Sequence, residues 1–373
     1  MVEKADVLIL GAGIAGASLA HALADHLEVV VVERESQTGY HSTGRSAAML
    51  IETYGSDAVQ RLTRLSRPFF ECPTELFSSS PLLTARGYLR IARADQQDEL
   101  DLAYQAAQSA GAPIQRLDQQ EVVRTGPLIA PGYAACGLFE PDAKAIDVSA
   151  LHQGYLRGMA RSGGRLICDA APHEIARSRA GWRVSTSAGD IEAQVLVNAG
   201  GAWADQIAAA AKIPEIGLAP TRRTAILLDP PDAADISSWP MIADIDYRFY
   251  VKPEGQQLMV SPADQTPAPP ADVQPEELDI AIAVDRYQTL TTMPVATIRH
   301  SWAGLRSFVR DGDPVVGFDP RQPGFFWLAG LGGFGIMTAP GIARLASALI
   351  MKKNLSNEHA LLAQAISPTR LRA

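Results

Sequence analysis

Cysteine, net positive charge and long apolar runs are all scarce in this 373-residue sequence. The three cysteines are far apart and form no C-x-x-C pair, so the sequence suggests neither a disulfide framework nor a metal site. The net charge of −8 disfavours nucleic-acid binding, because non-specific binding to phosphates depends on Lys and Arg. No stretch reaches the roughly 20 uninterrupted apolar residues of a membrane span. We therefore expect a reduced, cytoplasmic protein without a transmembrane segment, nucleic-acid partner or metal. Peripheral association with a membrane stays open, and a monomer is favoured.

The most apolar segment, residues 7–24, resembles a secretory signal peptide. Its flanks and interior do not fit that interpretation. Glu3 and Asp6 stand where a signal peptide is basic, regularly spaced glycines interrupt the apolar run, and His21 lies inside it. We therefore interpret the segment as a buried strand, a glycine turn and a buried helix.

The glycine turn has the pattern G-x-G-x-x-G, formed by Gly11, Gly13 and Gly16, between a β-branched run and an alanine-rich helical pattern. A second strand follows at residues 28–32, and Glu33 ends it about 20 residues after the first glycine. In such a unit the glycines allow a tight turn and close approach of a pyrophosphate to the helix N-terminus. The acidic residue accepts hydrogen bonds from ribose hydroxyls and repels a 2′-phosphate. The sequence therefore predicts a dinucleotide site and disfavours NADP.

A polar loop at residues 34–48, rich in small side chains, follows this unit and ends in an expected helix start. A domain that binds NAD normally continues directly into its second helix. The loop could instead place hydroxyl groups and backbone donors along a longer cofactor, which favours FAD.

Three motifs carry a resemblance to a known family: STGRSA at 42–47, NAGGAW at 198–203 and GGFGI at 332–336. They resemble the D-amino-acid oxidase and glycine oxidase superfamily of FAD enzymes. The stretches GYHSTGRSAA, VSALHQGYLRG, WAGLRSF and DGDPVVG are similar, more closely, to the bacterial FAD-dependent D-arginine dehydrogenases. The resemblance extends over essentially the whole chain. It implies an α/β fold in which a Rossmann-like FAD-binding domain is interleaved with an antiparallel-sheet α+β substrate domain.

The length allows two or three domains at roughly 100 to 200 residues each. We expect a discontinuous FAD-binding domain at 1–80, 140–215 and 300–373, and a substrate domain at 81–139 and 216–299. Helical patterns lie at 96–110 and 148–161. Strand-like runs lie at 81–91, 165–168, 182–187, 191–197, 223–228, 247–251 and 325–329. The proline-rich residues 262–275 predict a surface loop, and a last helix is expected to begin near Pro340.

Small residues are expected to pack against the cofactor where larger side chains would clash, and the glycine-rich turn after residue 329 offers an anion-stabilising helix N-terminus. In the family this turn faces the flavin pyrimidine edge. His173 falls where the family contacts the adenosine half through backbone atoms. The resemblance and the fingerprint together predict these cofactor-binding residues: Gly11, Gly13, Ala15, Gly16, Glu33, Arg34, Ser42, Thr43, Ser46, Ala47, Ala48, His173, Gly200, Trp203, Gly304, Gly332, Gly333, Gly335, Ile336 and Thr338.

The resemblance to the family also implies which residues bind the substrate. Arg306 matches the arginine that binds the substrate carboxylate, for which a planar guanidinium is suited. Tyr250 matches its tyrosine partner, Arg223 a second arginine, and Tyr54 a residue on a mobile active-site loop. Without the family, Arg306 would as readily pair with an aspartate at 311 or 313, and Tyr54 would be a core aromatic residue.

The implied reaction is hydride transfer from the Cα of a D-amino acid to flavin N5, followed by hydrolysis to a 2-oxo acid and ammonia. The chain departs from the D-arginine enzymes at residues 86–88, which contain no carboxylate for a substrate guanidinium, and at Met49, where those enzymes have histidine. A pocket of Met49, Ile51, Tyr88 and Gly333 favours neutral or apolar side chains over D-arginine. Glu52 is a nearby carboxylate that could restore cation binding.

Two other reactions would use the same residues to bind the substrate carboxylate, which we call the carboxylate clamp. They are the oxidation of glycine- or sarcosine-type amines and the oxidation of 2-hydroxy acids. A non-catalytic flavoprotein is a third alternative, which the clamp argues against. The electron acceptor is a quinone, another acceptor, or oxygen. Sarcosine oxidase relatives attach flavin through a carboxy-terminal cysteine, whereas the last cysteine here is Cys168, so the FAD is expected to be non-covalent.

Overall fold

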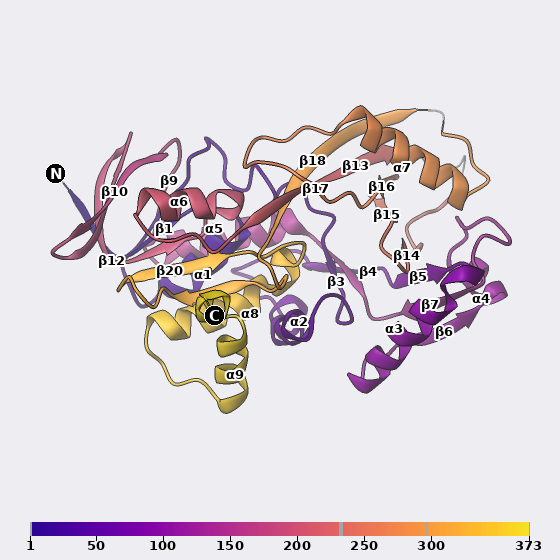
Figure 1. Ribbon diagram of the computed structural model, residues 1–373, viewed down its shortest axis with the longest axis horizontal. Helices are drawn as coiled ribbons and strands as arrows, with labels where there is room; N and C mark the ends of the chain where they lie inside the picture. Colours follow the sequence, from indigo (N-terminus) through magenta and orange to yellow (C-terminus); the bar gives the residue numbers. More distant parts are fainter. Residues whose placement is uncertain (1, 231–233, 296, 373) are drawn as a thin grey trace.

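The computed structural model describes residues 2–230, 234–295 and 297–372, whose strands form three sheets (Figure 1). In these residues the first sheet has eight strands, in the order β10-β11-β12-β1-β2-β9, with β20 between β12 and β19. Strands β9, β2, β1, β12 and β20 are parallel, as in a dinucleotide-binding domain. The strands are β1 Glu3–Leu10, β2 Val29–Val32, β9 Arg165–Ile167, β10 Pro172–Ser178, β11 Gly181–Thr186, β12 Gly189–Asn198, β19 Val315–Phe318 and β20 Phe325–Ala329.

Both faces of the first sheet are buried, which explains why its central strands have nearly continuous apolar sequences. Successive side chains of a strand point to opposite faces. Val7 and Ile9 of β1 accordingly belong to one hydrophobic cluster, whereas Leu8 and Leu10 belong to another. Burying such a side chain stabilises the fold by about 1.5–3 kcal/mol.

Helices cover these two faces. Helix α1 packs between α5 and α8, and α2 packs against α8 (Figure 1). The helices beside the first sheet are α1 Ile14–Leu23, α2 Asp57–Glu71, α5 Val148–Arg161, α6 Ala204–Ala210, α8 Gly335–Ile350 and α9 Asn357–Ala365, with short 3₁₀ helices at η2 Gly201–Trp203 and η3 Pro368–Arg372.

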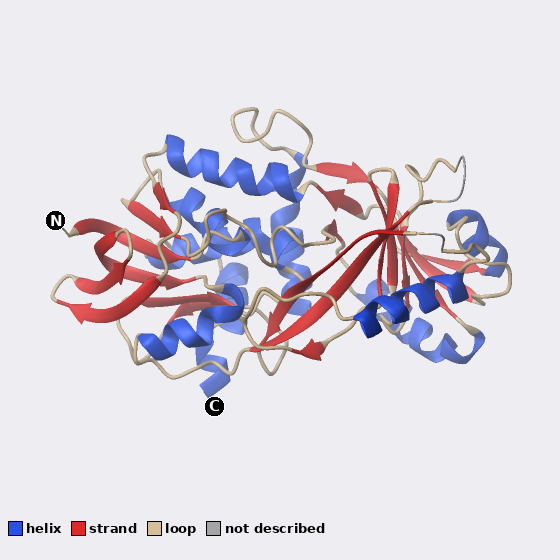
Figure 2. Cartoon of the chain, turned by 90° about the horizontal axis from the view of Figure 1, so that it is seen from above, coloured by secondary structure: helices blue, strands red, loops and turns tan. Residues whose placement is uncertain are grey.

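The second sheet is mostly antiparallel, in the order β17-β13-β16-β15-β14-β5-β7-β6, with β18 also paired to β13. Its strands are β5 Tyr88–Ala92, β6 Gln115–Asp118, β7 Cys136–Glu140, β13 Ala219–Leu228, β14 Met241–Asp244, β15 Tyr250–Glu254, β16 Gln257–Ser261, β17 Thr266–Pro267 and β18 Ile298–Phe308. Figure 2 shows β13 and β18 as a long strand pair that reaches from the middle of the molecule into this sheet.

The remaining elements complete the second half of the molecule. Helices α3 Gln97–Ser109, α4 Gln119–Thr125 and α7 Glu277–Leu290, with the 3₁₀ turn η1 Ala94–Gln96, pack beside the second sheet (Figure 1). A small third sheet has the order β3-β8-β4, from β3 Met49–Leu50, β8 Lys144–Ile146 and β4 Leu83–Ala85.

The structure confirms the predicted strand–turn–helix at the amino terminus and the helices expected near 96–110 and 148–161. Two local predictions are wrong. No helix starts at residues 42–48; the loop instead enters β3, because pairing with β8 overrides the helix propensity of the alanines. The last long helix begins at Gly335, not near Pro340; the helix continues through this proline at the loss of one backbone hydrogen bond.

Two further differences concern the second sheet. The strand expected at 247–251 begins only at Tyr250, because Tyr247 lies in a turn with φ of +55°. The loop at 262–275 contains the short strand β17, which pairs with β13.

We propose the two interleaved domains in the ranges given above, with one qualification. Strand β18 crosses the boundary at residue 300, since it pairs with β13 along most of its length.

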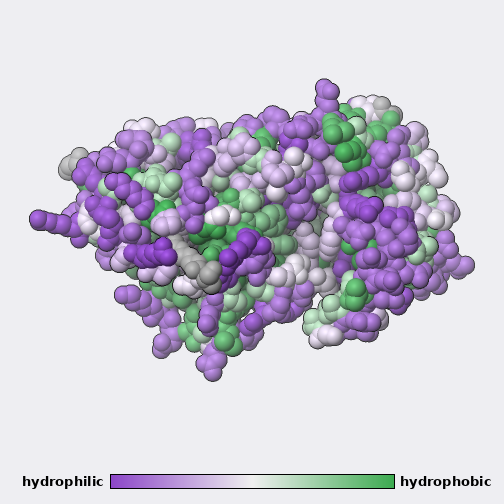
Figure 3. All heavy atoms as spheres, in the orientation of Figure 1, coloured by the Kyte–Doolittle hydropathy of each residue, from purple (hydrophilic) through white to green (hydrophobic). Residues whose placement is uncertain are grey.

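The face seen in Figure 3 is mainly hydrophilic, with hydrophobic side chains in limited areas. Among the described residues, none of the helices is both long and apolar enough to cross a membrane.

Candidate cofactor and substrate site

The G-x-G-x-x-G segment forms the turn between β1 and the N-terminus of α1. Gly11 has a φ of +107°, and a Cβ there would lie 2.5 Å from the carbonyl oxygen of Ala199. A Cβ on Gly16 would lie 1.9 Å from the oxygen of Gly11. Gly13 caps α1 without a side-chain hydrogen bond, and Thr43 accepts from the following backbone N–H. The turn therefore brings backbone donors to a helix end where a pyrophosphate is stabilised.

Glu33 lies at the end of β2 with 8% of its surface exposed. One carboxylate oxygen accepts from the Ala12 amide at 2.8 Å and the other from the Glu35 amide at 3.1 Å. A carboxylate has further acceptor sites, so ribose hydroxyls can still bind. The guanidinium of Arg34 lies 4.9 Å from the centroid of the Trp203 ring, and His41 packs on the same ring with centroids 4.6 Å apart.

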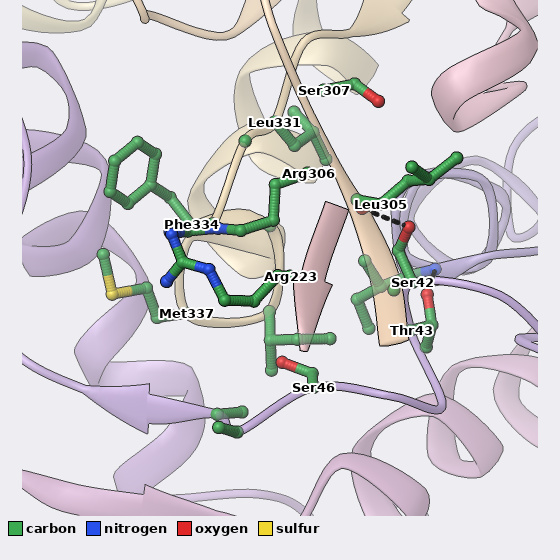
Figure 4. Close-up of a pocket in the computed structure, with 18 of the residues that line it drawn as sticks. Ser42, Thr43, Ser46, Arg223, Leu305, Arg306, Ser307, Leu331, Phe334 and Met337 are labelled. Carbon is green, nitrogen blue, oxygen red and sulfur yellow. Dashed lines mark hydrogen bonds between the residues drawn. The ribbon is translucent and has the colours of Figure 1, made fainter. Parts of the chain in front are cut away.

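A cavity of about 430 Å³ starts at this turn and continues between the two large sheets. Most of the predicted residues line it: Gly13, Ala15, Ser42, Thr43, Ser46, Ala47, Ala48, Met49, Ile51, Tyr54, Tyr88, Arg223, Tyr250, Gly304, Arg306, Gly332, Gly333, Gly335 and Ile336. Figure 4 shows part of this lining, with the hydrogen bond that the Ser42 hydroxyl donates to the Leu305 carbonyl at 2.6 Å.

The other predicted residues lie outside that lining. Gly11, Gly16, Glu33, Arg34, Gly200 and Trp203 lie in or around the phosphate turn and at the end of β12. Thr338 is fully buried in α8, where its hydroxyl donates to the Phe334 carbonyl. His173 is exposed on β10. Its contact with a cofactor therefore remains a proposal.

Two arginines point into the cavity from adjacent strands. Arg223 of β13 is opposite Gly304 of β18, and Arg306 of β18 is opposite Thr221. Residues two apart on a strand share a face, so both arginines lie on the same face as diagonal neighbours. Gly304 has no side chain that would separate them. Figure 4 shows the two guanidinium groups close together beside Phe334.

The charges of these arginines are not neutralised inside the cavity. Burial, and next the charge of Arg306, lower the pKa of Arg223 below its usual value. Its Nε donates to the carbonyl of Asp264 at 2.8 Å. Arg306 does not pair with the aspartates considered from the sequence, since Asp311 pairs with Arg370 and the carboxylate of Asp313 accepts from Ser56. Among the described residues, no Asp or Glu lines the cavity. The cavity is therefore suited to an anion.

Tyr54 connects Arg306 to the far wall of the cavity. Its hydroxyl accepts a hydrogen bond from Nη2 of Arg306 at 2.9 Å. Its ring packs against Phe334 and Tyr247, with centroids 5.1 and 5.5 Å away. Tyr54 thus contacts Arg306 inside the cavity and takes part in the aromatic packing of its wall.

The turn before α8 needs its glycines because neighbouring side chains leave no space for a Cβ. Gly332 has a φ of +52°, and a Cβ on it would meet the ring of Phe308. A Cβ on Gly333 would lie 1.3 Å from Nη2 of Arg306, so any side chain there would displace the guanidinium. The glycines therefore allow the turn and Arg306 to approach each other closely.

The end of the cavity away from the phosphate turn is apolar and aromatic. Met49, Ile51 and Tyr88 pack there with Met241 and Ala243. Burial raises the pKa of Tyr88 well above its usual value, so its hydroxyl stays protonated at neutral pH.

The two charged groups considered near this end of the cavity are used elsewhere. Arg86 donates to backbone carbonyls at 237 and 239, and Glu52 pairs with Arg67. Neither lines the cavity. Glu52 therefore does not fill the place of a carboxylate for a cationic substrate.

Several lining residues were missed from the sequence: Met241, Ala243, Tyr247, Gln265, Phe334 and Met337. Phe334 lies inside the GGFGI motif and Met337 follows it in α8, whereas the others come from β14 and from loops without a recognisable pattern. His152 was also missed, although it lies in the quoted stretch VSALHQGYLRG. Its Nε2 lies 2.8 Å from the Ala12 carbonyl, so it donates to the phosphate turn, and burial lowers its pKa.

Comparisons with known proteins agree with this geometry. The family model described as DAO, FAD dependent oxidoreductase, matches residues 6–349. Glycine oxidase from Geobacillus kaustophilus (strain HTA426) is 23% identical over 365 residues, covering 95% of this chain and 94% of that relative. The crystal structure of glycine oxidase from Geobacillus kaustophilus has a TM-score of 0.84 at 21% identity, covering 95% of this chain and 96% of its own. The crystal structure of L-proline dehydrogenase from P. horikoshii has a TM-score of 0.85 at 21% identity, covering 100% of this chain and 99% of its own.

The chain therefore belongs to the DAO family of FAD-dependent oxidoreductases, and its cofactor is FAD. The predicted mixed α/β fold is confirmed by the similarity to these structures. The residues present fit the cofactor, because the close contacts of Gly11 and Gly16 and the donors around Gly13 form the expected phosphate turn.

Proposed function

We propose that the protein oxidises D-amino acids to 2-oxo acids and ammonia, and that it prefers neutral or apolar side chains over D-arginine. The observation that carries this proposal is the pair of Arg306 and Tyr54 beside Arg223, in a cavity that runs on from the phosphate turn and has no Asp or Glu among its described lining residues. An amino-acid substrate presents the carboxylate that such a cationic site can hold.

Each side chain has a separate role in this proposal. Arg306 binds the substrate carboxylate, and Tyr54, already hydrogen-bonded to Arg306, fixes the orientation of its guanidinium. Arg223 adds a second positive charge, and the hydroxyl of Tyr250 faces the same cavity. FAD, when bound, accepts the hydride from Cα. We assign no general base, since the protein contributes orientation and electrostatics.

The apolar end of the cavity supports the preference for neutral substrates. Burying the side chain of D-arginine among Met49, Ile51 and Tyr88 would leave its guanidinium without an acidic partner. This is a departure from the D-arginine dehydrogenases, to which the sequence motifs point most closely.

A second candidate is oxidation of glycine- or sarcosine-type amines, favoured by the glycine oxidases that align over nearly the whole chain. Oxidation of 2-hydroxy acids would use the same clamp. The products separate these reactions: a primary amino acid releases ammonia, whereas a 2-hydroxy acid gives a 2-oxo acid without ammonia.

The test is an anaerobic screen of flavin bleaching with the FAD-loaded protein. D- and L-amino acids, glycine, sarcosine and 2-hydroxy acids are mixed with the protein, and the flavin absorbance is followed. We expect fastest bleaching with D-methionine, D-phenylalanine or D-leucine. Faster bleaching by glycine, sarcosine or a 2-hydroxy acid would overturn the proposal. Mixing the reduced protein with air-saturated buffer or a quinone then identifies the electron acceptor.

A further inference from the structure

A second cavity, of about 360 Å³, lies behind the loop that carries Tyr54. We call it the rear cavity and define it by Tyr54, Gln60, Arg90, Ala106, Ala107 and Tyr247. Tyr54 and Tyr247 also line the substrate cavity, so these two aromatic side chains form a common wall. A molecule in the rear cavity would touch the same side chains that enclose the substrate.

The cationic group of the rear cavity is Arg90 on β5, with only 6% of its surface exposed. Its side chain interacts with the hydroxyl of Tyr247 and, through space, with Glu140. The Glu140 carboxylate is already engaged, because it accepts from the Glu52 amide at 2.9 Å and from the hydroxyl of Thr53.

Arg90 therefore has donors to spare. In the described part of the chain Arg90 interacts with Glu140 only through space, without an ion pair within 4.0 Å, and no acidic side chain there lines the rear cavity. The donors of Arg90 that Tyr247 does not use can bind water or an anion in the rear cavity.

The opposite wall consists of small apolar side chains on α3, which lies beside β7 in Figure 1. Ala103, Ala106 and Ala107 occupy one face of the helix, at the spacing of neighbours on a helix surface. Ala107 is buried, whereas Ala106 is exposed, so the cavity opens to solvent at that point. The side-chain amide of Gln60 donates to the loop carbonyls of residues 53 and 55, so its N–H groups are already used and do not bind a ligand in the cavity.

We propose that the rear cavity binds a small monocarboxylate, with its carboxylate on Arg90 and its short apolar part against the alanines of α3. A bound carboxylate braces Tyr54 and Tyr247 from behind, and Tyr54 is hydrogen-bonded to Arg306. Occupancy of the rear cavity therefore restricts the side chains that enclose a substrate bound at Arg306 and lowers kcat. The ligand is either the 2-oxo acid product or an unrelated free acid; only the effect on turnover rests on the proposed function.

Binding is tested by thermal unfolding of the FAD-loaded Arg306→Met variant, in which the substrate cavity keeps only Arg223 and competes less for carboxylates. Acetate and pyruvate are titrated against chloride at equal ionic strength and against acetamide. We expect a saturable rise in Tm with the carboxylates alone. Adding Ala106→Trp, which fills the cavity, should weaken the apparent affinity by about tenfold or more, whereas the matched Gln105→Trp on the same helix should leave it unchanged.

A second pair of variants does not depend on filling the cavity. Ala106→Glu places a negative charge at its opening and should weaken carboxylate binding, whereas Gln105→Glu should have little effect. Equal responses of the 105 and 106 variants, or a response to acetate no greater than that to chloride, would overturn the site. A tighter response to pyruvate than to acetate identifies the product as the ligand, and the reverse order identifies a free acid.

Turnover provides the second measurement. At a saturating D-amino acid, carboxylate should lower kcat by about twofold or more in the wild type and in Gln105→Trp, but not in Ala106→Trp. Purely competitive inhibition in all three would refute the coupling. If none of the screened substrates bleaches the flavin, the proposed function fails, but the thermal titration still tests the rear cavity.

Discussion

Replacing Arg306 by Met removes the guanidinium that we propose to bind the substrate carboxylate, while methionine keeps much of the length of the side chain. The variant loses the hydrogen bond to Tyr54 at 2.9 Å and leaves the substrate carboxylate with Arg223 alone. Truncating one member of a buried charge pair costs about 2–5 kcal/mol. Arg306 is only partly buried, which places the expected loss in the lower part of that range, about 2–3.5 kcal/mol.

At about 1.4 kcal/mol per tenfold change, this loss lowers kcat/KM by roughly 30- to 400-fold. The assay is the rate of anaerobic flavin reduction as a function of the concentration of the best substrate. Flavin content and Tm should stay normal, since the guanidinium is not part of the phosphate turn. The matched control is Arg299→Met on the same strand, where the arginine is exposed and paired with Asp229, and kcat/KM should hardly change.

A decrease of less than about tenfold in kcat/KM, with normal folding and flavin content, would refute the role of Arg306 as the carboxylate clamp. In that case Arg223 would be the remaining candidate. Its Nε is bound to the Asp264 carbonyl, but its other donors face the same cavity.

The other predictions concern specificity, packing, pH and cofactor attachment. D-Arginine should have a kcat/KM about tenfold or more below that of D-methionine, because none of the described residues that line the cavity is an acid for its guanidinium; comparable values would contradict this. Gly333→Ala should lower kcat/KM by about tenfold or more while flavin content is retained, since the new Cβ would displace Arg306; unchanged kinetics would show that the guanidinium is held elsewhere. Burial lowers the pKa of His152, so the stability from its neutral ring is present above the unfolded pKa near 6.5 and is lost as the pH falls below it. Denaturant unfolding between pH 7.5 and about 5.5 should therefore show a steeper loss in the wild type than in His152→Asn. Acid precipitation should release all of the flavin into the supernatant, and flavin retained in the pellet would indicate covalent attachment.

The cofactor turn could be predicted from the sequence because its geometry is local. Gly11 and Gly16 are needed where the backbone of one short segment folds against itself, and the following acidic residue is at a fixed distance along the chain. Glu33 accordingly reaches the Ala12 amide. Local patterns failed where distant strands decide the conformation, as in the loop at 42–48, which ends in β3 through its pairing with β8.

The walls of the two cavities could not be predicted for a related reason. Tyr247 is part of an apparently strand-like run, but it lies in a turn of positive φ next to β14. The parallel pairing of β14 with β5 then brings this turn to Arg90 and Tyr88. Because that pairing joins residues about 150 positions apart, the composition and spacing near residue 247 carry no signal for it.

The strand pairing also explains why one arginine of the pair Arg222-Arg223 faces the candidate site and the other does not. Side chains alternate across β13, so the two neighbours must point to opposite faces. Arg222 is paired with Glu276 and Asp279 around α7, which neutralises its charge. Arg223 faces the cavity beside Arg306, because β13 and β18 pair in a register that aligns Arg223 with Gly304. A shift of this register by one residue would turn Arg223 toward the acidic residues around α7 and would take Arg222 away from them. The β13–β18 register therefore decides which of the two arginines faces the cavity and which one is neutralised beside α7.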